Sequence, residues 1–198
     1  MRLEHLIPLI SYLLGSIPFG YILVRSTEGK DIRSFGSGNI GATNVFRRSK
    51  LSGILTLVLD AGKGYLAVAV AGWLGGSLGW QAIAALCAIV GHVFTVWLRF
   101  KGGKGVATGC GAYLALSPLA VLTTLGLFVI ILLLTRYISA SSIGATAFFP
   151  VCAYLYGEPV PVLFWSVLGA VLIIVKHHQN IRRLLSGTEN KLVLGTRS

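Results

Sequence analysis

The sequence predicts an all-α integral membrane protein with seven transmembrane helices. Hydrophobic residues make up 55% of the 198 positions, charged residues make up only 12%, and the mean hydropathy is +0.79. A soluble domain of this length needs a more highly charged surface, so that class is excluded. The apolar runs are also long and continuous, whereas the strands of a membrane β-barrel alternate apolar and polar residues.

Five apolar segments each have about the 20 residues that a helix needs to cross the hydrocarbon layer. These predicted spans are residues 3–24, 51–73, 80–98, 139–156 and 160–176. The first one has no small-x-small cleavage site before Arg25, so we expect a retained span rather than a signal peptide.

The segment 106–135 is too long for one ordinary span, and Ser117-Pro118 interrupts it. Proline disfavours the helical conformation in the residue before it, and it is well suited to the first turn of a new helix. We therefore expect two further spans, over residues 104–116 and 118–135.

The positions of Lys and Arg predict the orientation. One side of a seven-span chain receives the segments 25–50, 99–105, 136–138 and 177–198. Together with Lys176, these segments contain every Lys and Arg except Arg2 and Lys63, while the loops on the other side contain only Glu158 as a charged residue. Because cytoplasmic loops are enriched in Lys and Arg, we expect an external N-terminus and a cytoplasmic C-terminus. The expected organisation is a single polytopic domain over residues 1–198, with a cytoplasmic tail over 177–198.

A short internal similarity raises the question of a duplication. The pentapeptide NIGAT at 39–43 recurs as SIGAT at 142–146, and each follows a predicted span. Spans one to three and five to seven run in the same direction in this arrangement, so a parallel duplication of three helices is one explanation. A chance match between short glycine- and alanine-containing strings is the other.

The net charge is +11, from 17 Lys and Arg and 6 Asp and Glu. In a membrane protein such an excess is typical of loops that face anionic lipid or an anionic substrate, so we expect no nucleic-acid partner. Cys87, Cys110 and Cys152 lie far apart in apolar runs without a Cys-x-x-Cys pair. We therefore expect buried free thiols and neither a metal site nor a cofactor.

The first of three polar stretches on the predicted cytoplasmic side is FGSGNIGATNVFRRSK, residues 35–50. Ser37, Asn39, Thr43 and Asn44 supply hydroxyl and amide groups, and Arg47 has the forked guanidinium that suits a phosphate. The alternative is a helix-capping loop, because Ser, Thr and Asn are also preferred at helix N-termini.

The second stretch is RFKGGKGVATG, residues 99–109, in which glycines flank Lys104 just before a helix. Glycine lets backbone N–H groups approach an anion, and a helix N-terminus adds unpaired donors and partial positive charge. Lys101 and Lys104 add full charges. Gly105 follows the lysine, so this is not a Walker A loop. The alternative is a flexible basic turn.

The third stretch is KHHQNIRRLLSGTENK, residues 176–191, at the end of the last span. His177 and Asn180 lie one helical turn apart, and the histidine is suited to titrate near neutral pH. A histidine there is also ordinary for a membrane interface. Glu189 is the acid of the tail, and an ion pair with a loop cation is as good an explanation as catalysis.

Asp60 and Lys63 lie inside a predicted span at positions i and i+3, where they can neutralise each other. Charges within a membrane are functional candidates by default. Both a structural pair and a lysine that reaches the polar site are therefore open. Ser141 and Ser142 begin the sixth span and add hydroxyl groups on the cytoplasmic side.

Polar groups on one side of the membrane favour an enzyme that joins a soluble anionic substrate to a lipid. A transporter of a phosphorylated solute is the main alternative, but it needs polar groups near the middle of the bilayer. Spans three, five and seven are almost wholly apolar. A basic membrane anchor leaves the three polar stretches unexplained.

The strings GSGNIGATNVFR (36–47), KGGKGVAT (101–108) and HHQNIRRLLSGTE (177–189) resemble, in this order, the signature motifs of a bacterial enzyme family. This is the acyl-phosphate:glycerol-3-phosphate acyltransferase family, or PlsY family, and the resemblance extends over nearly the whole chain. It implies a multi-pass protein of the bacterial cytoplasmic (inner) membrane with its active site on the cytoplasmic side. The implied reaction transfers a fatty acyl group from acyl phosphate to the sn-1 hydroxyl of glycerol 3-phosphate. The products are lysophosphatidic acid and phosphate, in the first acylation of phospholipid synthesis.

The resemblance also implies binding roles for individual residues. The expected acyl-phosphate site contains Ser37, Gly38, Asn39, Gly41, Thr43, Asn44 and Arg47. The expected glycerol 3-phosphate site contains Lys101, Gly102, Gly103, Lys104, Gly105, Ser142, His177 and Asn180.

The expected catalytic residues are Ser37, His177 and Asn180, with the last two orienting the attacking hydroxyl. No Ser-His-acid triad is visible, so Ser37 is expected to hydrogen-bond the substrate rather than to carry the acyl group. His177 and a substrate phosphate are both candidates for the proton acceptor. Asp60, Lys63, His92 and Glu189 are left as structural residues or residues without an assigned role. No His-x-x-x-x-Asp sequence occurs, in agreement with the implied absence of acyl-CoA or acyl-carrier-protein donors.

Overall fold

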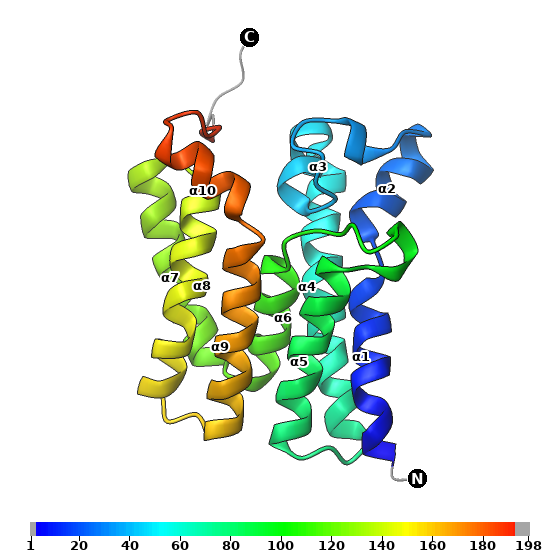
Figure 1. Cartoon of the computed structure of the whole chain (residues 1–198), viewed down its shortest axis with the longest axis vertical. Coiled ribbons are helices and arrows are strands. Elements are labelled where there is room, and N and C mark those ends of the chain that lie inside the picture. The colour runs from blue at the N-terminus through cyan, green and yellow to red at the C-terminus, as the bar shows by residue number, and fades with distance from the viewer. Residues whose placement is uncertain (1–2, 193–198) are drawn as a thin grey trace. The chain divides into compact units, whose positions relative to one another are not determined.

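In the computed structural model, which describes residues 3–192, every regular element of that range is a helix (Figure 1). The chain divides into two compact units, Met1–Leu116 and Ser117–Ser198. The all-helical class predicted from the sequence is confirmed. A single domain over residues 1–198 stays a prediction.

The first unit is built around one long helix. Its helices are α1 (Ile7–Ser16), α2 (Phe19–Glu28), α3 (Ala42–Arg48), α4 (Lys50–Trp73), α5 (Leu78–Val93) and α6 (Val106–Leu116). The long helix α4 contacts each of the other five, and α1 also packs along α5. Small residues allow this close approach: a Cβ on Gly64 would meet the backbone of Thr108, and one on Gly111 would meet the backbone of Ala61. Such contacts between small residues are typical of helices packed within membranes.

The first predicted span, residues 3–24, is not one continuous helix. Helix α1 ends at Ser16 and α2 begins at Phe19, with Ile17 and Pro18 between them. Proline has no backbone N–H and clashes with the preceding turn, which explains the break. The third predicted span, residues 80–98, lies within the candidate span Leu78–Leu98, in which α5 stops at Val93 and a short 3₁₀ turn, Val96–Leu98, follows it.

The second unit contains α7 (Pro118–Thr135), α8 (Ile138–Leu155), α9 (Val160–Val175) and α10 (His178–Leu185). Helix α8 contacts the other three. Pro118 occupies the first turn of α7 and Ser117 precedes it, as the sequence predicts. The predicted tail 177–198 therefore begins with a short helix, and residues 193–198 lie outside the described range.

The number of spans is lower than predicted when helix length is the criterion. Among the described residues, five segments are long and apolar enough to cross a membrane, and a sixth is added if α9 and α10, which bend by 56°, count as one. Helix α6 has only 11 residues, a rise of about 16 Å against roughly 30 Å of hydrocarbon. The integral membrane class is supported, while seven spans and the orientation remain predictions.

The two similar pentapeptides adopt different backbone structures. Residues 39–41 lie in a loop before α3, whereas residues 142–146 lie inside α8. Their similarity therefore gives no support to a duplication.

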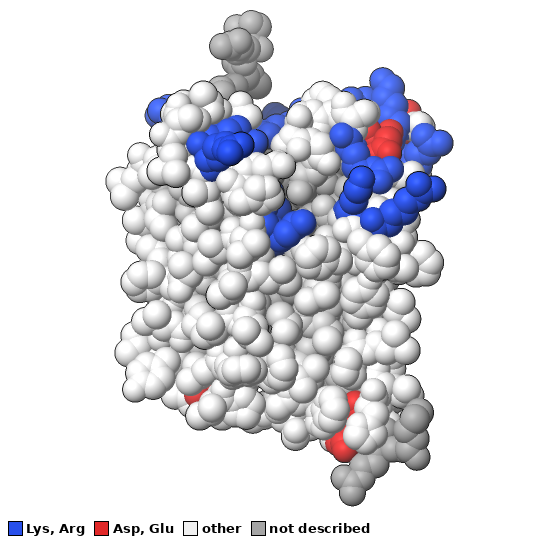
Figure 2. Space-filling view, viewed as in Figure 1, with Lys and Arg blue, Asp and Glu red and all other residues white. Residues whose placement is uncertain are grey.

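Lys and Arg side chains gather at one end of each unit (Figure 2). In the first unit, Lys and Arg surround the turn after α2 and the start of α3, while the end near the N-terminus carries an acidic side chain. In the second unit, the cations lie near α10 and an acidic side chain lies at the turn between α8 and α9. Each unit therefore has one basic end.

Candidate active site

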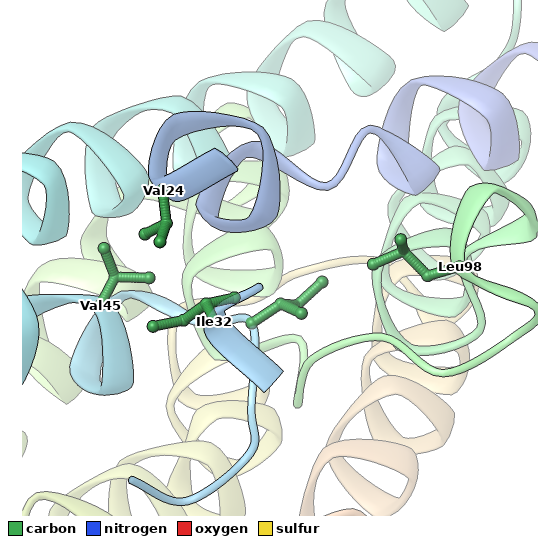
Figure 3. Packing of buried hydrophobic residues seen from close by; sticks show 5 residues of the cluster. Val24, Ile32, Val45 and Leu98 are labelled. Carbon is green, nitrogen blue, oxygen red and sulfur yellow. The ribbon is translucent and has the colours of Figure 1, made fainter. Parts of the chain in front are cut away.

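The first polar loop is attached to the helices by a small hydrophobic cluster (Figure 3). Val24 of α2, Ile32 of the 3₁₀ turn Ile32–Ser34, Val45 of α3 and Leu98 after α5 are buried together, with Ile40 beside them. Their burial removes apolar surface from water and fixes the polar segment between them.

Asn44, at the start of α3, organises the inside of this loop. Its side chain is 2% exposed. The Oδ1 atom accepts a hydrogen bond of 3.0 Å from the Ser37 amide, and Nδ2 donates bonds of 2.9 Å to the carbonyls of Phe35 and Asn39. The amide thus satisfies backbone groups from three positions of the loop. Asn44 is buried and bonds to the backbone of the loop, so we expect it to set the shape of the predicted acyl-phosphate site rather than to contact the substrate.

Asn39 and two glycines shape the exposed edge of the loop. Asn39 Oδ1 accepts a bond of 2.8 Å from the Gly41 amide, which closes a turn within the loop just before α3. Gly36 and Gly38 have φ angles of +56° and +69°, which glycine adopts without steric cost. Asn39 and Asn44 therefore hold the backbone of the loop, and neither side chain caps α3. Ser37, Thr43 and Arg47 are exposed, and within residues 3–192 their side chains have no hydrogen-bond or ion-pair partner.

Arg47 differs in this respect from the arginines around it. Arg48 forms an ion pair of 2.5 Å with Glu28 and lies over the ring of Phe35. Arg33 forms an ion pair of 2.6 Å with Asp31, and this hydrogen bond holds the pKa of Asp31 below its ordinary value. These arginines are used by the fold, which leaves the Arg47 guanidinium as the available fork for a phosphate.

The second polar stretch is docked on the C-terminal end of α5. The Gly102 amide donates a bond of 3.1 Å to the Val93 carbonyl, and the Gly103 amide donates one of 3.0 Å to the His92 carbonyl. A Cβ on Gly102 would meet the His92 carbonyl, and one on Gly103 would meet the His92 ring. These two glycines therefore allow close docking, and their N–H groups are already used.

The remaining groups of this stretch suit an anion. Lys101 is exposed and Lys104 is half-buried. Gly105, with φ of +88°, leads directly into α6, whose first intrahelical bond is that from the Gly109 amide to the Gly105 carbonyl. The N–H groups of that first turn have no acceptor within the helix, and they carry the positive end of the helix dipole. Two backbone hydrogen bonds therefore dock the loop on α5, and its positive groups are the α6 N-terminus and the two lysines.

Below the second stretch lies a buried charged group. Lys63 Nζ is 2.7 Å from Asp60 Oδ1 and 2.9 Å from His92 Nδ1, and all three side chains are at most 4% exposed. Lys63 Nζ also donates a bond of 2.7 Å to the Ile17 carbonyl at the helix break. Asp60 and Lys63 form the structural pair that was one of the two predicted alternatives, and His92 joins them.

In the second unit, the tail residue Glu189 collects three donors. Its carboxylate accepts bonds of 2.8 Å from Asn180 Nδ2, 2.6 Å from Arg183 Nε and 2.9 Å from Ser139 Oγ. Burial raises the pKa of Glu189, but these hydrogen bonds outweigh it, so the net pKa lies below the ordinary value. The predicted ion pair of Glu189 is present. Ser139 was missed by the sequence reasoning, because nothing local links it to a residue 50 positions away.

His177 lies at the bend between α9 and α10 and is 2% exposed. Its Nδ1 is 2.8 Å from the Ile173 carbonyl. A carbonyl only accepts, so Nδ1 carries the hydrogen and Nε2 is the basic atom of the neutral ring. Ser142 is buried in α8, while Ser141 bonds to the Tyr137 carbonyl within its own helix.

The predicted site residues thus fall into two groups. Ser37, Arg47 and the Lys101–Gly105 loop belong to the first unit, and Ser142, His177 and Asn180 belong to the second. Among the described residues, no group of three or more His, Cys, Asp or Glu is placed to hold a metal ion.

Comparison with known proteins gives the family. Residues 5–187 match the family model described as glycerol-3-phosphate acyltransferase. The chain is 48% identical over 191 residues to the glycerol-3-phosphate acyltransferase of Geotalea daltonii. The aligned residues are 96% of this chain and 98% of the relative. It is 50% identical to the enzyme of that name from Trichlorobacter lovleyi, over 91% of this chain and 93% of the relative.

Solved structures agree with the sequence comparison. The fold is similar to the crystal structure of PlsY (YgiH), an integral membrane glycerol 3-phosphate acyltransferase, in its glycerol 3-phosphate form. The TM-score is 0.90 and the identity 39%, over 96% of both chains. The lysophosphatidic acid form gives a TM-score of 0.87 at 37% identity, over 96% of this chain and 95% of that one. The chain therefore belongs to the glycerol-3-phosphate acyltransferase family.

Proposed function

We propose that this protein transfers a fatty acyl group from acyl phosphate to the sn-1 hydroxyl of glycerol 3-phosphate. The products are lysophosphatidic acid and inorganic phosphate, in the first acylation of phospholipid synthesis. The observation that carries the proposal is the family match over residues 5–187, which includes the first two polar stretches and residues 176–187 of the third. The similar PlsY structures are described as glycerol 3-phosphate and lysophosphatidic acid forms, the acceptor and the product of this reaction.

In the proposed reaction, the sn-1 oxygen attacks the acyl carbonyl carbon, and the bond from that carbon to the phosphate oxygen breaks. Both substrates carry phosphate, so two cationic sites are needed. Arg47 and Ser37, both exposed, are proposed to bind the acyl phosphate, with the loop geometry set by Asn44. Lys101, Lys104 and the α6 N-terminus are proposed to bind glycerol 3-phosphate.

His177 and Asn180 are proposed to orient the attacking hydroxyl. The bond between His177 Nδ1 and the Ile173 carbonyl supports this role, because it leaves Nε2 as the hydrogen-bond acceptor. The hydroxyl proton passes either to this nitrogen or to the phosphate leaving group. Acyl phosphate is already activated, so the reaction does not require a strong base on the protein.

We also propose seven crossings of the bacterial cytoplasmic (inner) membrane, with an external N-terminus and the active site on the cytoplasmic side. Within each unit, the gathering of Lys and Arg at one end supports this orientation (Figure 2). Helix α6, with 11 residues, is the shortest of the proposed crossings. A C-terminal reporter that is accessible from outside intact cells would contradict the orientation.

The decisive experiment supplies the purified, membrane-reconstituted protein with radiolabelled glycerol 3-phosphate and either palmitoyl phosphate or palmitoyl-CoA. We expect labelled lysophosphatidic acid with palmitoyl phosphate and none with palmitoyl-CoA. A product from palmitoyl-CoA would contradict the proposed donor. Uptake of label into vesicles without acylation would instead support the transporter alternative.

A further inference from the structure

We propose that Lys63 is a positioning residue for the glycerol 3-phosphate loop, Lys101–Gly105. Its buried ammonium group joins the break in the first span to the end of α5, on which the loop is docked. The identity of the loop's ligand rests on the proposed function, whereas the placement of Lys63 rests on the geometry of the first unit.

The Lys63 ammonium contacts three different elements. Its Nζ reaches Asp60 of α4 at 2.7 Å, the Ile17 carbonyl between α1 and α2 at 2.7 Å, and His92 of α5 at 2.9 Å. The Asp60 contact is an ion pair, and the contacts with Ile17 and His92 are hydrogen bonds donated by the ammonium group. The planar fork of arginine does not converge on three points in this way, and an apolar side chain has no donor.

The helix break exposes carbonyls that these donors satisfy. A backbone carbonyl that loses its helical partner within a membrane must find a donor inside the protein. The Ser16 carbonyl accepts a bond of 2.5 Å from Thr95 Oγ1, and the Ile17 carbonyl accepts from Lys63 as well as from the Phe19 amide. Thr95 lies just beyond α5, close in sequence to the loop, and Lys63 is bonded to His92. Both carbonyls at the break are therefore tied to the end of α5.

His92 connects Lys63 to the loop. Because an ammonium only donates, His92 Nδ1 is the acceptor, and the neutral ring carries its hydrogen on Nε2. The Nε2 atom lies against Gly103, where a Cβ would overlap it. The carbonyls of His92 and Val93 accept from the Gly103 and Gly102 amides at 3.0 and 3.1 Å. A shift of the His92 ring therefore moves the backbone that leads to Lys104.

Neutralising Asp60 is a separate role of Lys63, and the two roles can be distinguished. Removing Lys63 alone leaves the Asp60 carboxylate buried without a counter-charge, which is strongly destabilising. Removing both charges, in Asp60→Asn/Lys63→Met, leaves no buried ion. The double variant still lacks the donor to Ile17 and His92. It therefore tests positioning without the effect of an unpaired charge.

The experiment measures KM for both substrates, and glycerol 3-phosphate binding by calorimetry, in reconstituted wild-type and variant protein. For Asp60→Asn/Lys63→Met we expect a smaller loss of thermal stability than for Lys63→Met alone, because no unpaired charge is left buried. We also expect KM and Kd for glycerol 3-phosphate to rise at least about tenfold, since a small misplacement of binding groups is costly. KM for acyl phosphate is expected to change less than about twofold, because its site does not use this contact.

Two further variants serve as controls. Lys63→Arg keeps the charge and is expected to show the same rise in KM for glycerol 3-phosphate, because the geometry is lost. Thr56→Val changes another buried polar residue of α4, whose hydroxyl bonds to the Ser52 carbonyl of its own helix. That variant is expected to keep both KM values.

The other outcomes would overturn either the inference or the proposed function. A double variant with wild-type affinity for glycerol 3-phosphate would show that Lys63 only neutralises Asp60. Equal changes in both KM values would indicate general loosening. If the wild type binds glycerol 3-phosphate but does not use acyl phosphate, the proposed function fails and the binding comparison still decides the role of Lys63. If the wild type does not bind glycerol 3-phosphate, the inference fails as well.

Discussion

The side-chain amide of Asn180 donates a hydrogen bond of 2.8 Å to the carboxylate of Glu189, nine residues further along the chain. The same carboxylate accepts from Arg183 and from Ser139 of α8, and the Leu192 amide bonds to the Arg136 carbonyl. The tail thus folds back over the start of α8 and holds α10 in place. This contact fixes which end of the Asn180 amide faces Glu189.

Glu189→Gln is expected to lower activity at least about tenfold and to destabilise the protein by about 1–3 kcal/mol, because one of three donors loses its acceptor. Turnover and thermal unfolding in detergent measure the two effects. Glu158→Gln, in the turn between α8 and α9, is the matched acidic control and should match the wild type. Equal behaviour of the two variants would contradict this role of Glu189.

The same contact predicts a dependence of stability on pH. The folded-state pKa of Glu189 lies below its ordinary value of 4.5. The stability that this group contributes is therefore fully present above pH 4.5 and is lost as the pH falls through the lower folded-state pKa. Melting temperatures measured from neutral to acid pH should fall less steeply in Glu189→Gln than in the wild type. Parallel curves would count against the prediction.

Two adjacent arginines are expected to give opposite results. Arg47 is exposed without an ion-pair partner among residues 3–192, whereas Arg48 is paired with Glu28. Arg47→Ala should reduce activity at least about 10²-fold with unchanged melting temperature, since a phosphate contact is lost. Arg48→Ala should lower the melting temperature and affect turnover less. The reverse pattern would show that the acyl phosphate is bound elsewhere.

Gly103→Ala is expected to raise KM for glycerol 3-phosphate by at least about tenfold, because the added Cβ would overlap the His92 ring and displace the loop. Gly62→Ala is the control in the same unit, since a Cβ there would meet nothing within 4 Å. Steady-state kinetics with each substrate varied in turn measure the effect. A Gly103→Ala enzyme with unchanged KM would show that close docking on α5 is unnecessary.

Ser37 is expected to act as a hydrogen-bond donor and not as a nucleophile. Its side chain is exposed and has no base among its hydrogen-bond partners in the described chain. Ser37→Ala should reduce turnover about 10²-fold. Acid-quenched wild-type reactions with labelled acyl phosphate should contain no covalently acylated protein. Label retained on a peptide that contains Ser37 would establish an acyl-enzyme instead.

Proline shows how far local sequence rules extend. Pro118 was predicted to start a helix and does so, but Pro18 breaks the first span while Pro150 lies inside α8 without ending it. A break within a membrane requires donors for the freed carbonyls. At Pro18 these donors come from Lys63 and Thr95, 46 and 79 residues away from the carbonyls that they satisfy. The sequence near each proline does not contain this information.

The sequence alone determined the membrane class, the helical segments and the three polar stretches, because the bilayer imposes length and hydropathy on each span separately. The Asp60–Lys63 pair also followed from local spacing. Only the tertiary structure decided that the buried Asn44 side chain bonds to the backbone of its own loop. It also decided that the Gly102 and Gly103 amides bond to carbonyls at the end of α5. It also joined His92 to Lys63 and Ser139 to Glu189, over 29 and 50 residues. Such partners are selected by how the helices pack, and helix packing depends on contacts between distant residues rather than on any local pattern.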